Sequence, residues 1–108
     1  MSNKDQGNAA FKAKDYPTAI EFYTKAIEEN PTDHTIYGNR AAAYQNSTQF
    51  TEAIEDADKC IELKSDWAKG YIRKGMALQA ASKLHDAMEM YEAAEKCDHD
   101  AAQVEKLK

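Results

Sequence analysis

Hydrophobic residues recur along the chain at helical spacing. After Pro17, the residues Ala19, Ile20, Tyr23 and Ile27 fall on one face of a 3.6-residue period. Pro17 suits the first turn of a helix, where its missing N–H removes no hydrogen bond. Stretches of this kind, separated by short turns, predict six helices over residues 2–14, 17–29, 33–46, 51–63, 67–80 and 85–97. Because short turns join antiparallel neighbours, we expect three helical hairpins.

The helical pattern itself repeats at a step of 34 residues. This step links three sets of positions: Gly7, Ala41 and Gly75; Ala19, Ala53 and Ala87; and Tyr23, Ala57 and Tyr91. Small residues recur where two helices approach closely, and large ones recur where the space between helices must be filled. The sequence therefore predicts a single all-α domain over 1–108, with repeats at about 1–33, 34–67 and 68–100. The segment 101–108 is expected to form a short capping helix over the last repeat.

The balance of charge argues against several classes of partner. Lys and Arg total 14 against 19 Asp and Glu, which gives a net charge of −5. A general attraction to nucleic acid or to an anionic membrane is therefore not expected. No apolar run approaches the roughly 20 residues of a membrane span, and the first residues lack the apolar core of a secretory signal. We expect a cytoplasmic protein whose Cys60 and Cys97 are reduced thiols.

Catalytic and metal-binding patterns are weak. The three histidines are scattered over turns and helix edges, and no nucleophile has an evident orienting partner. We therefore predict no enzyme, no metal and no cofactor. An acidic run on the fourth helix is expected to be a solvated outer surface; it comprises Glu52, Glu55, Asp56 and Asp58.

Cations and amides at helical spacing are the more informative chemistry. Lys4 and Asn8 are four residues apart, as are Lys69 and Arg73, so each pair shares a helix face. Asn8 and Asn39 lie in mid-helix, where asparagine is unfavourable, which suggests that their amides have a binding role. Side chains that only donate, beside amides, suit a carboxylate ligand.

The 34-residue helix-turn-helix unit resembles the tetratricopeptide repeat (TPR) family over nearly the whole chain. The stretches around Asn8 and Asn39, and the run from Trp67 to Lys74, resemble the carboxylate-clamp subclass of that family. The resemblance implies a right-handed superhelix whose concave groove is lined by the first helix of each hairpin. It would also put Lys12 on the groove face, outside the five clamp positions.

The resemblance implies a role for each clamp residue. Lys4, Asn8 and Asn39 would hold the terminal α-carboxylate of a peptide, Lys69 its last aspartate, and Arg73 its backbone or an upstream acid. Four further residues would form side-chain pockets for the peptide: Phe11, Ala42, Ile72 and Met76. Members of the subclass bind the C-terminal Glu-Glu-Val-Asp tails of the cytosolic chaperones Hsp70 and Hsp90.

The stretches 7–11 and 14–20 resemble the first such module of Hop-type chaperone-organising co-chaperones, which favours Hsp70 over Hsp90 as partner. Two alternatives remain open. The chain could be a TPR scaffold that binds an internal peptide, or a targeting module of a larger isomerase, phosphatase or ubiquitin ligase. A test with free-acid and amidated peptides would separate a clamp from a scaffold.

Overall fold

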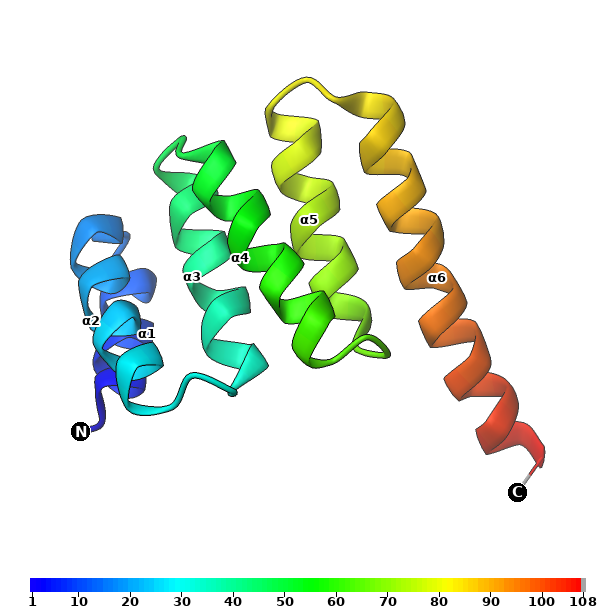
Figure 1. The fold of residues 1–108 in the computed structure, drawn as a ribbon, viewed down its shortest axis with the longest axis horizontal. Coiled ribbons are helices and arrows are strands. Elements are labelled where there is room, and N and C mark those ends of the chain that lie inside the picture. The colour runs from blue at the N-terminus through cyan, green and yellow to red at the C-terminus, as the bar shows by residue number, and fades with distance from the viewer. Residues whose placement is uncertain (108) are drawn as a thin grey trace.

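The computed structural model describes the backbone of residues 1–107 and the side chains of residues 1–97. Within that part the chain forms six helices, which confirms the all-α prediction (Figure 1). They are α1 (Asn3–Lys12), α2 (Tyr16–Glu29), α3 (His34–Asn46), α4 (Phe50–Leu63), α5 (Ala68–Ala80) and α6 (Leu84–Leu107). Apart from the end of α6, each boundary lies within two residues of its predicted place. None of these helices combines the length and the apolar character needed to span a bilayer.

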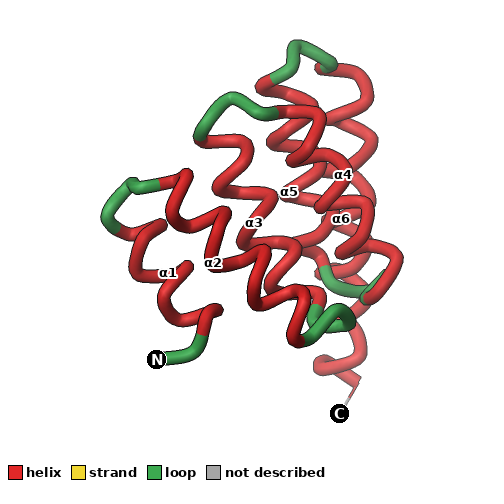
Figure 2. The backbone as a smooth tube through the Cα atoms, turned by 60° about the vertical axis from the view of Figure 1, so that its left-hand side comes forward, coloured by secondary structure: helices red, strands yellow, loops and turns green. Residues whose placement is uncertain are grey.

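The helices are stacked as successive hairpins (Figure 2). Each helix packs on the next in sequence, and in addition α1 contacts α3 and α3 contacts α5. The first helices of the three hairpins therefore form one continuous layer, while α2, α4 and α6 each pack on the first helix of their own hairpin. This arrangement brings side chains from α1, α3 and α5 to a common face.

Close packing of a tyrosine on a glycine recurs in the first and third hairpins. A β-carbon added to Gly7 would lie 2.6 Å from ring carbons of Tyr23, and one added to Gly75 would lie 2.7 Å from the Tyr91 ring. The expectation that small residues mark close helix approach is confirmed at these positions. Close packing also explains the glycine at position 38, because a β-carbon there would lie 3.2 Å from the Trp67 ring.

The turn inside each hairpin has one conformation. Its left-handed residue is never glycine, and the three examples are 34 residues apart: Lys14 (φ 62°), Thr48 (φ 63°) and Ser82 (φ 66°). The next residue donates its N–H to the carbonyl five positions back, at 2.8–2.9 Å, which closes the end of the helix. Nothing in the residue types at these positions predicted this, since glycine is the usual occupant.

The prediction of a separate capping helix is wrong. Helix α6 runs unbroken from Leu84 to Leu107, so residues 101–107 belong to it. The stretch after Cys97 contains no glycine or proline that would end a helix. Lys108 and the contacts of a cap lie outside the described residues.

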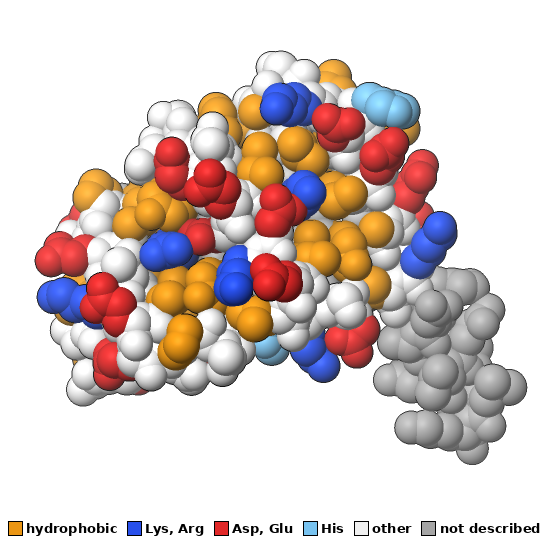
Figure 3. All heavy atoms as spheres, in the orientation of Figure 1, with side chains coloured by type: hydrophobic (Ala, Val, Ile, Leu, Met, Phe, Trp, Pro, Cys, Tyr) orange, Lys and Arg blue, Asp and Glu red, His pale blue; other side chains and the backbone are white. Residues whose placement is uncertain are grey.

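The prediction that the acidic run is wholly solvated is wrong for Asp56, which is 5% exposed. Its carboxylate receives hydrogen bonds from Arg40 Nε at 2.7 Å and Nη2 at 2.8 Å, while Nη1 donates to Thr24 at 3.2 Å. The half-buried Arg40 guanidinium thus gains a bidentate partner, and it joins α3 to α4 through Asp56 and to α2 through Thr24. On the face seen in Figure 3, acidic, basic and hydrophobic side chains are interspersed.

Candidate functional site

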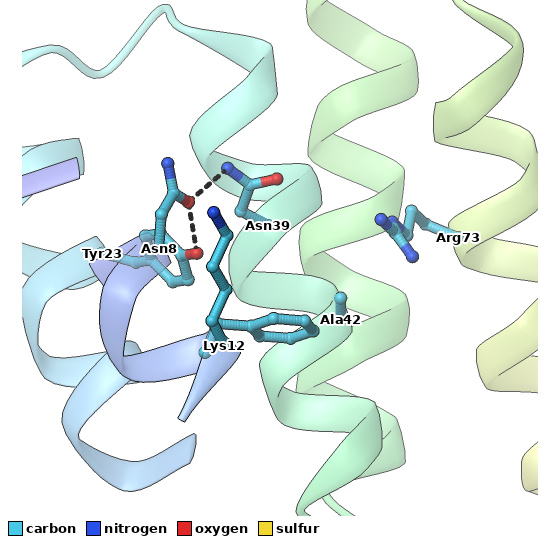
Figure 4. Close-up of a pocket in the computed structure, with 7 residues that line it drawn as sticks. Asn8, Lys12, Tyr23, Asn39, Ala42 and Arg73 are labelled. Atoms are coloured by element: carbon cyan, nitrogen blue, oxygen red, sulfur yellow. Dashed lines mark hydrogen bonds between the residues drawn. The ribbon is translucent and has the colours of Figure 1, made fainter. Parts of the chain in front are cut away.

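An open pocket of about 210 Å³ lies on the layer formed by α1, α3 and α5. Its lining consists of Asn8, Phe11 and Lys12 from α1, Tyr23 from α2, Asn39 and Ala42 from α3, and Arg73 from α5. Figure 4 shows these side chains converging from separate helices. The pocket therefore exists only because the three hairpins are stacked.

Hydrogen bonds fix the orientation of the Asn8 amide. Its carbonyl oxygen accepts from the Tyr23 hydroxyl at 2.6 Å and from Asn39 Nδ2 at 3.2 Å (Figure 4). Two donors on the oxygen leave the amino group, Nδ2, as the part of Asn8 that is available to a ligand. Burial raises the pKa of Tyr23 to about 12, and the charge of Arg73 offsets part of that rise. The hydroxyl therefore remains a donor at neutral pH.

The apolar wall of the pocket comes from two of the four residues expected there. Phe11 and Ala42 both line it, Phe11 from α1 and Ala42 from α3. Ile72 and Met76 lie on α5 outside this pocket, half-buried and 36% exposed respectively.

The two expected cations on α5 are placed differently. The Arg73 side chain extends towards α3 and lines the pocket, whereas Lys69, one turn earlier, is exposed and lies outside it. Neither side chain forms an ion pair with any residue of 1–97. Both charges are therefore uncompensated within the part of the chain whose side chains are described.

Lys4 lies apart from the pocket, in contact with the beginning of α3. Its ammonium donates to Thr35 Oγ1 at 2.7 Å and to Asp33 Oδ2 at 3.4 Å. It borders a second cleft that also includes Glu29. Burial tends to raise the pKa of Asp33, but hydrogen bonds from Thr35 and the charge of Lys4 outweigh it and lower the pKa below its ordinary value. Asp33 is therefore charged at neutral pH and holds Lys4.

Two pocket residues were given no binding role in the sequence interpretation. Tyr23 was assigned only to packing, because its position in the repeat pattern explains it as a core residue. Lys12 was placed on the groove face without a function, although its spacing of four residues from Asn8 was a usable signal. The structure brings Asn8, Asn39 and Arg73 together as expected, and adds these two residues to them.

A metal site has no support among residues 1–97, where no three His, Cys, Asp or Glu side chains gather. Cys60 is fully buried, and burial raises the pKa of its thiol to about 12, with Asp56 adding to the rise. A thiol in that state is a poor nucleophile and a poor metal ligand.

Stacked 34-residue hairpins whose first helices form one layer define a helical-repeat domain, and this one has a donor-lined pocket on that layer. A family model described as "Serine/threonine-protein kinase BSK1-like, TPR repeats" matches residues 1–80. The chain belongs to the tetratricopeptide repeat family.

Relatives of high identity include heat shock proteins and Hsp70-Hsp90 organizing proteins. The chain is 46% identical over 101 residues to the heat shock protein sti1 homolog of Schizosaccharomyces pombe, which covers 94% of this chain. It is 49% identical over 102 residues to the STIP1 homolog of Dictyostelium discoideum, again covering 94% of the chain. The chain spans only 17% and 18% of the length of these two relatives.

Solved TPR domains have the same fold. The TPR2B domain of yeast Sti1, in complex with an Hsp70 peptide, is 35% identical with a TM-score of 0.89 over 94% of this chain and 81% of that one. The first TPR domain of Spaghetti (RPAP3), bound to the Hsp90 peptide SRMEEVD, is 34% identical with a TM-score of 0.85 over 88% of this chain and 75% of that one.

Proposed function

We propose that this chain is a co-chaperone adaptor module that binds the C-terminal Glu-Glu-Val-Asp tail of Hsp70 or Hsp90 in the cytoplasm. The ligand is held by its carboxylates. Asn8 and Asn39 donate to the terminal α-carboxylate, Arg73 and Lys69 neutralise the acidic groups further along, and Lys4 joins them when it leaves Asp33. Ala42 leaves room for the valine side chain, and Phe11, Ile72 and Met76 flank the residue before the two glutamates.

One observation carries the proposal: the pocket presents donors and uncompensated positive charge to a single space. The Asn8 oxygen is occupied by Tyr23 and Asn39, and Arg73 has no ion-pair partner among residues 1–97. Such a pocket suits a carboxylate and disfavours a neutral or cationic group. Relatives and structural neighbours whose names include Hsp70 and Hsp90 support the same class of ligand.

The magnitudes are consistent with a weak, reversible contact. A charge-assisted hydrogen bond contributes roughly 1.5–3 kcal/mol when partly shielded from water. Several such bonds, less the free energy of ordering a short peptide, leave about 7–8 kcal/mol, which corresponds to a micromolar dissociation constant.

The proposal is tested by calorimetry with one octapeptide in two forms, a free acid ending in Glu-Glu-Val-Asp and its C-terminal amide. We expect the free acid to bind about tenfold or more tightly, because the amide lacks the charge that Asn8 and Asn39 receive. Its binding should also weaken as salt rises. Equal affinity for the two forms would instead favour a scaffold that binds an internal peptide.

Preference between the chaperones depends on residues before the last four. The resemblance to a first Hop-type module favours Hsp70, which two octapeptides that differ only upstream of Glu-Glu-Val-Asp would test. Tighter binding of the Hsp90-type peptide would reverse that preference. It would leave the clamp proposal valid, because both peptides end in the same four residues.

We further infer that the module has no catalytic role of its own. The described residues that line its pocket include no Ser, Cys, His, Asp or Glu that could serve as a nucleophile or a general base. An activity confined to residues 1–108 and abolished by changing a pocket residue would contradict this inference.

A further inference from the structure

Two lysines flank Asn8 on α1, one turn before it and one turn after it. Lys4, Asn8 and Lys12 are spaced by four residues, so all three share one face of the helix. The rest of the molecule distinguishes between the lysines. Lys4 donates to Thr35 and Asp33, whereas Lys12 lines the pocket with Asn8, Asn39 and Arg73.

The Lys12 side chain is directed towards the two amides. Figure 4 shows its ammonium pointing from the end of α1 along the pocket to the Asn8–Asn39 pair. The side chain forms no ion pair with any residue whose side chain the structure describes. Its charge is therefore available to a ligand, while that of Lys4 is already shared with a carboxylate.

Three kinds of donor then surround one space: the Asn8 amino group, the Asn39 amide and the Lys12 ammonium. An ammonium presents three donors and no acceptor, so a cationic or purely donating ligand group would be repelled there. A carboxylate can accept from all three at once. Among the residues whose side chains are described, no acidic one lines this pocket to compete for them.

We infer that Lys12 is a specificity-determining residue that binds a carboxylate of the peptide together with Asn8 and Asn39. This inference rests on the proposed function and extends it by adding a cation outside the five clamp positions. Lys12 can bind the peptide without a rearrangement, because no ion pair within the described residues has to break first. Lys12 therefore selects a peptide with a carboxylate that reaches Asn8 and Asn39. The C-terminal α-carboxylate of a free-acid peptide meets this requirement.

The test is calorimetry of Lys12→Ala, Lys12→Arg and the original chain with the free-acid octapeptide and its amide. We expect Lys12→Ala to weaken binding of the free acid about tenfold and to change binding of the amide about twofold or less. Lys12→Arg should recover most of the loss, since it keeps the charge. The Lys12→Ala variant should also show a shallower dependence of affinity on salt.

Lys25→Ala provides a matched control, because Lys25 is an exposed lysine on α2, paired with Glu21 and outside the pocket. Its affinities should equal those of the original chain. Thermal melting of each variant checks the fold, and Lys12 is exposed, so its removal should leave the melting temperature unchanged.

The possible results distinguish the inferred role of Lys12 from the proposed clamp function on which it rests. If the original chain prefers the free acid and Lys12→Ala binds it within twofold, the inference is overturned and the clamp stands. A loss in Lys12→Ala that is equal for acid and amide also overturns it, because the lysine would not then read the carboxylate. If the original chain treats acid and amide alike, the proposed function fails first.

Discussion

The two sides of the pocket hold their donors in different states. On the α1–α3 side, Asn8 is oriented by hydrogen bonds from Tyr23 and Asn39. On the α5 side, Arg73 lines the pocket and Lys69 lies one turn away, outside it; neither has an ion-pair partner among residues 1–97. Fixed donors lose little freedom on binding, whereas each long cation carries about 2 kcal/mol of rotamer entropy. Under the proposed function, the amide side would therefore orient the ligand, and the cations on α5 would supply most of its electrostatic attraction.

The largest effect is expected from removing the cation side. The double change Lys69→Ala and Arg73→Ala should weaken binding of the free-acid peptide about 100-fold, since two charge-assisted bonds are lost. Most of the salt dependence of binding should disappear with them. Calorimetry at low and moderate salt measures both quantities.

Lys74→Ala is the control for that double change. Lys74 is the next residue on α5, but it lies outside the pocket, and its ammonium pairs with the Asp58 carboxylate at a distance of 2.7 Å. Its affinity should match that of the original chain. A double variant that retains full affinity would show that the cation side does not engage the peptide.

A smaller effect is expected from loosening the amide side. In Tyr23→Phe the Asn8 oxygen loses one of its two donors, so the amide can rotate away from its binding orientation. Affinity for the free acid should fall about fivefold, and the loss of one hydrogen bond should lower the free energy of unfolding by about 1 kcal/mol. Calorimetry and thermal melting measure the two effects.

Tyr91→Phe separates these contributions. Tyr91 occupies the same repeat position beside Gly75, and its hydroxyl donates to Gln79 at 2.8 Å, outside the pocket. Because this hydrogen bond is exposed, Tyr91→Phe should lower the stability less than Tyr23→Phe does, and it should leave the affinity unaltered. If both variants bind the peptide as the original chain does, orientation of Asn8 by Tyr23 has no role in binding.

The smallest effect is expected where Lys4 is held outside the pocket. Asp33→Asn removes the charge that holds Lys4 and keeps a side chain that caps α3, since Asp33 accepts from the Thr35 N–H at 3.0 Å and asparagine caps equally well. Lys4 can then reach the peptide, and affinity should rise about twofold to threefold. An unchanged or lower affinity would mean that Asp33 does not compete with the ligand.

Lowering the pH would test the role of Asp33 less cleanly than Asp33→Asn does. The pKa of Asp33 is lowered in the folded protein, so the stabilisation from its charged form is present above the ordinary pKa of an aspartate. It is lost only as the pH falls through the lowered value. At that pH the carboxylates of the peptide are themselves being protonated, so the two effects would be confused.

Much of the fold followed from the chain alone, because one 34-residue period controls both helix position and helix contact. The helix boundaries and the packing of Tyr23 on Gly7 and Tyr91 on Gly75 could be predicted since each depends on spacing and side-chain size. The continuation of α6 to Leu107 was missed because a cap was expected from analogy with other repeat arrays, although no residue there ends a helix. Asp56 was missed because its partner, Arg40, lies on another helix.

The sequence by itself determined which side chains share a helix face, and so it placed Lys4, Asn8 and Lys12 on one stripe of α1 and Lys69 with Arg73 on α5. Only the tertiary structure decided which of these charges faces the pocket. The beginning of α3 brings Asp33 and Thr35 to Lys4 and leaves Lys12 beside the amides. Helical periodicity fixes directions within one helix, but the availability of a charge depends on which groups neighbouring helices set against it.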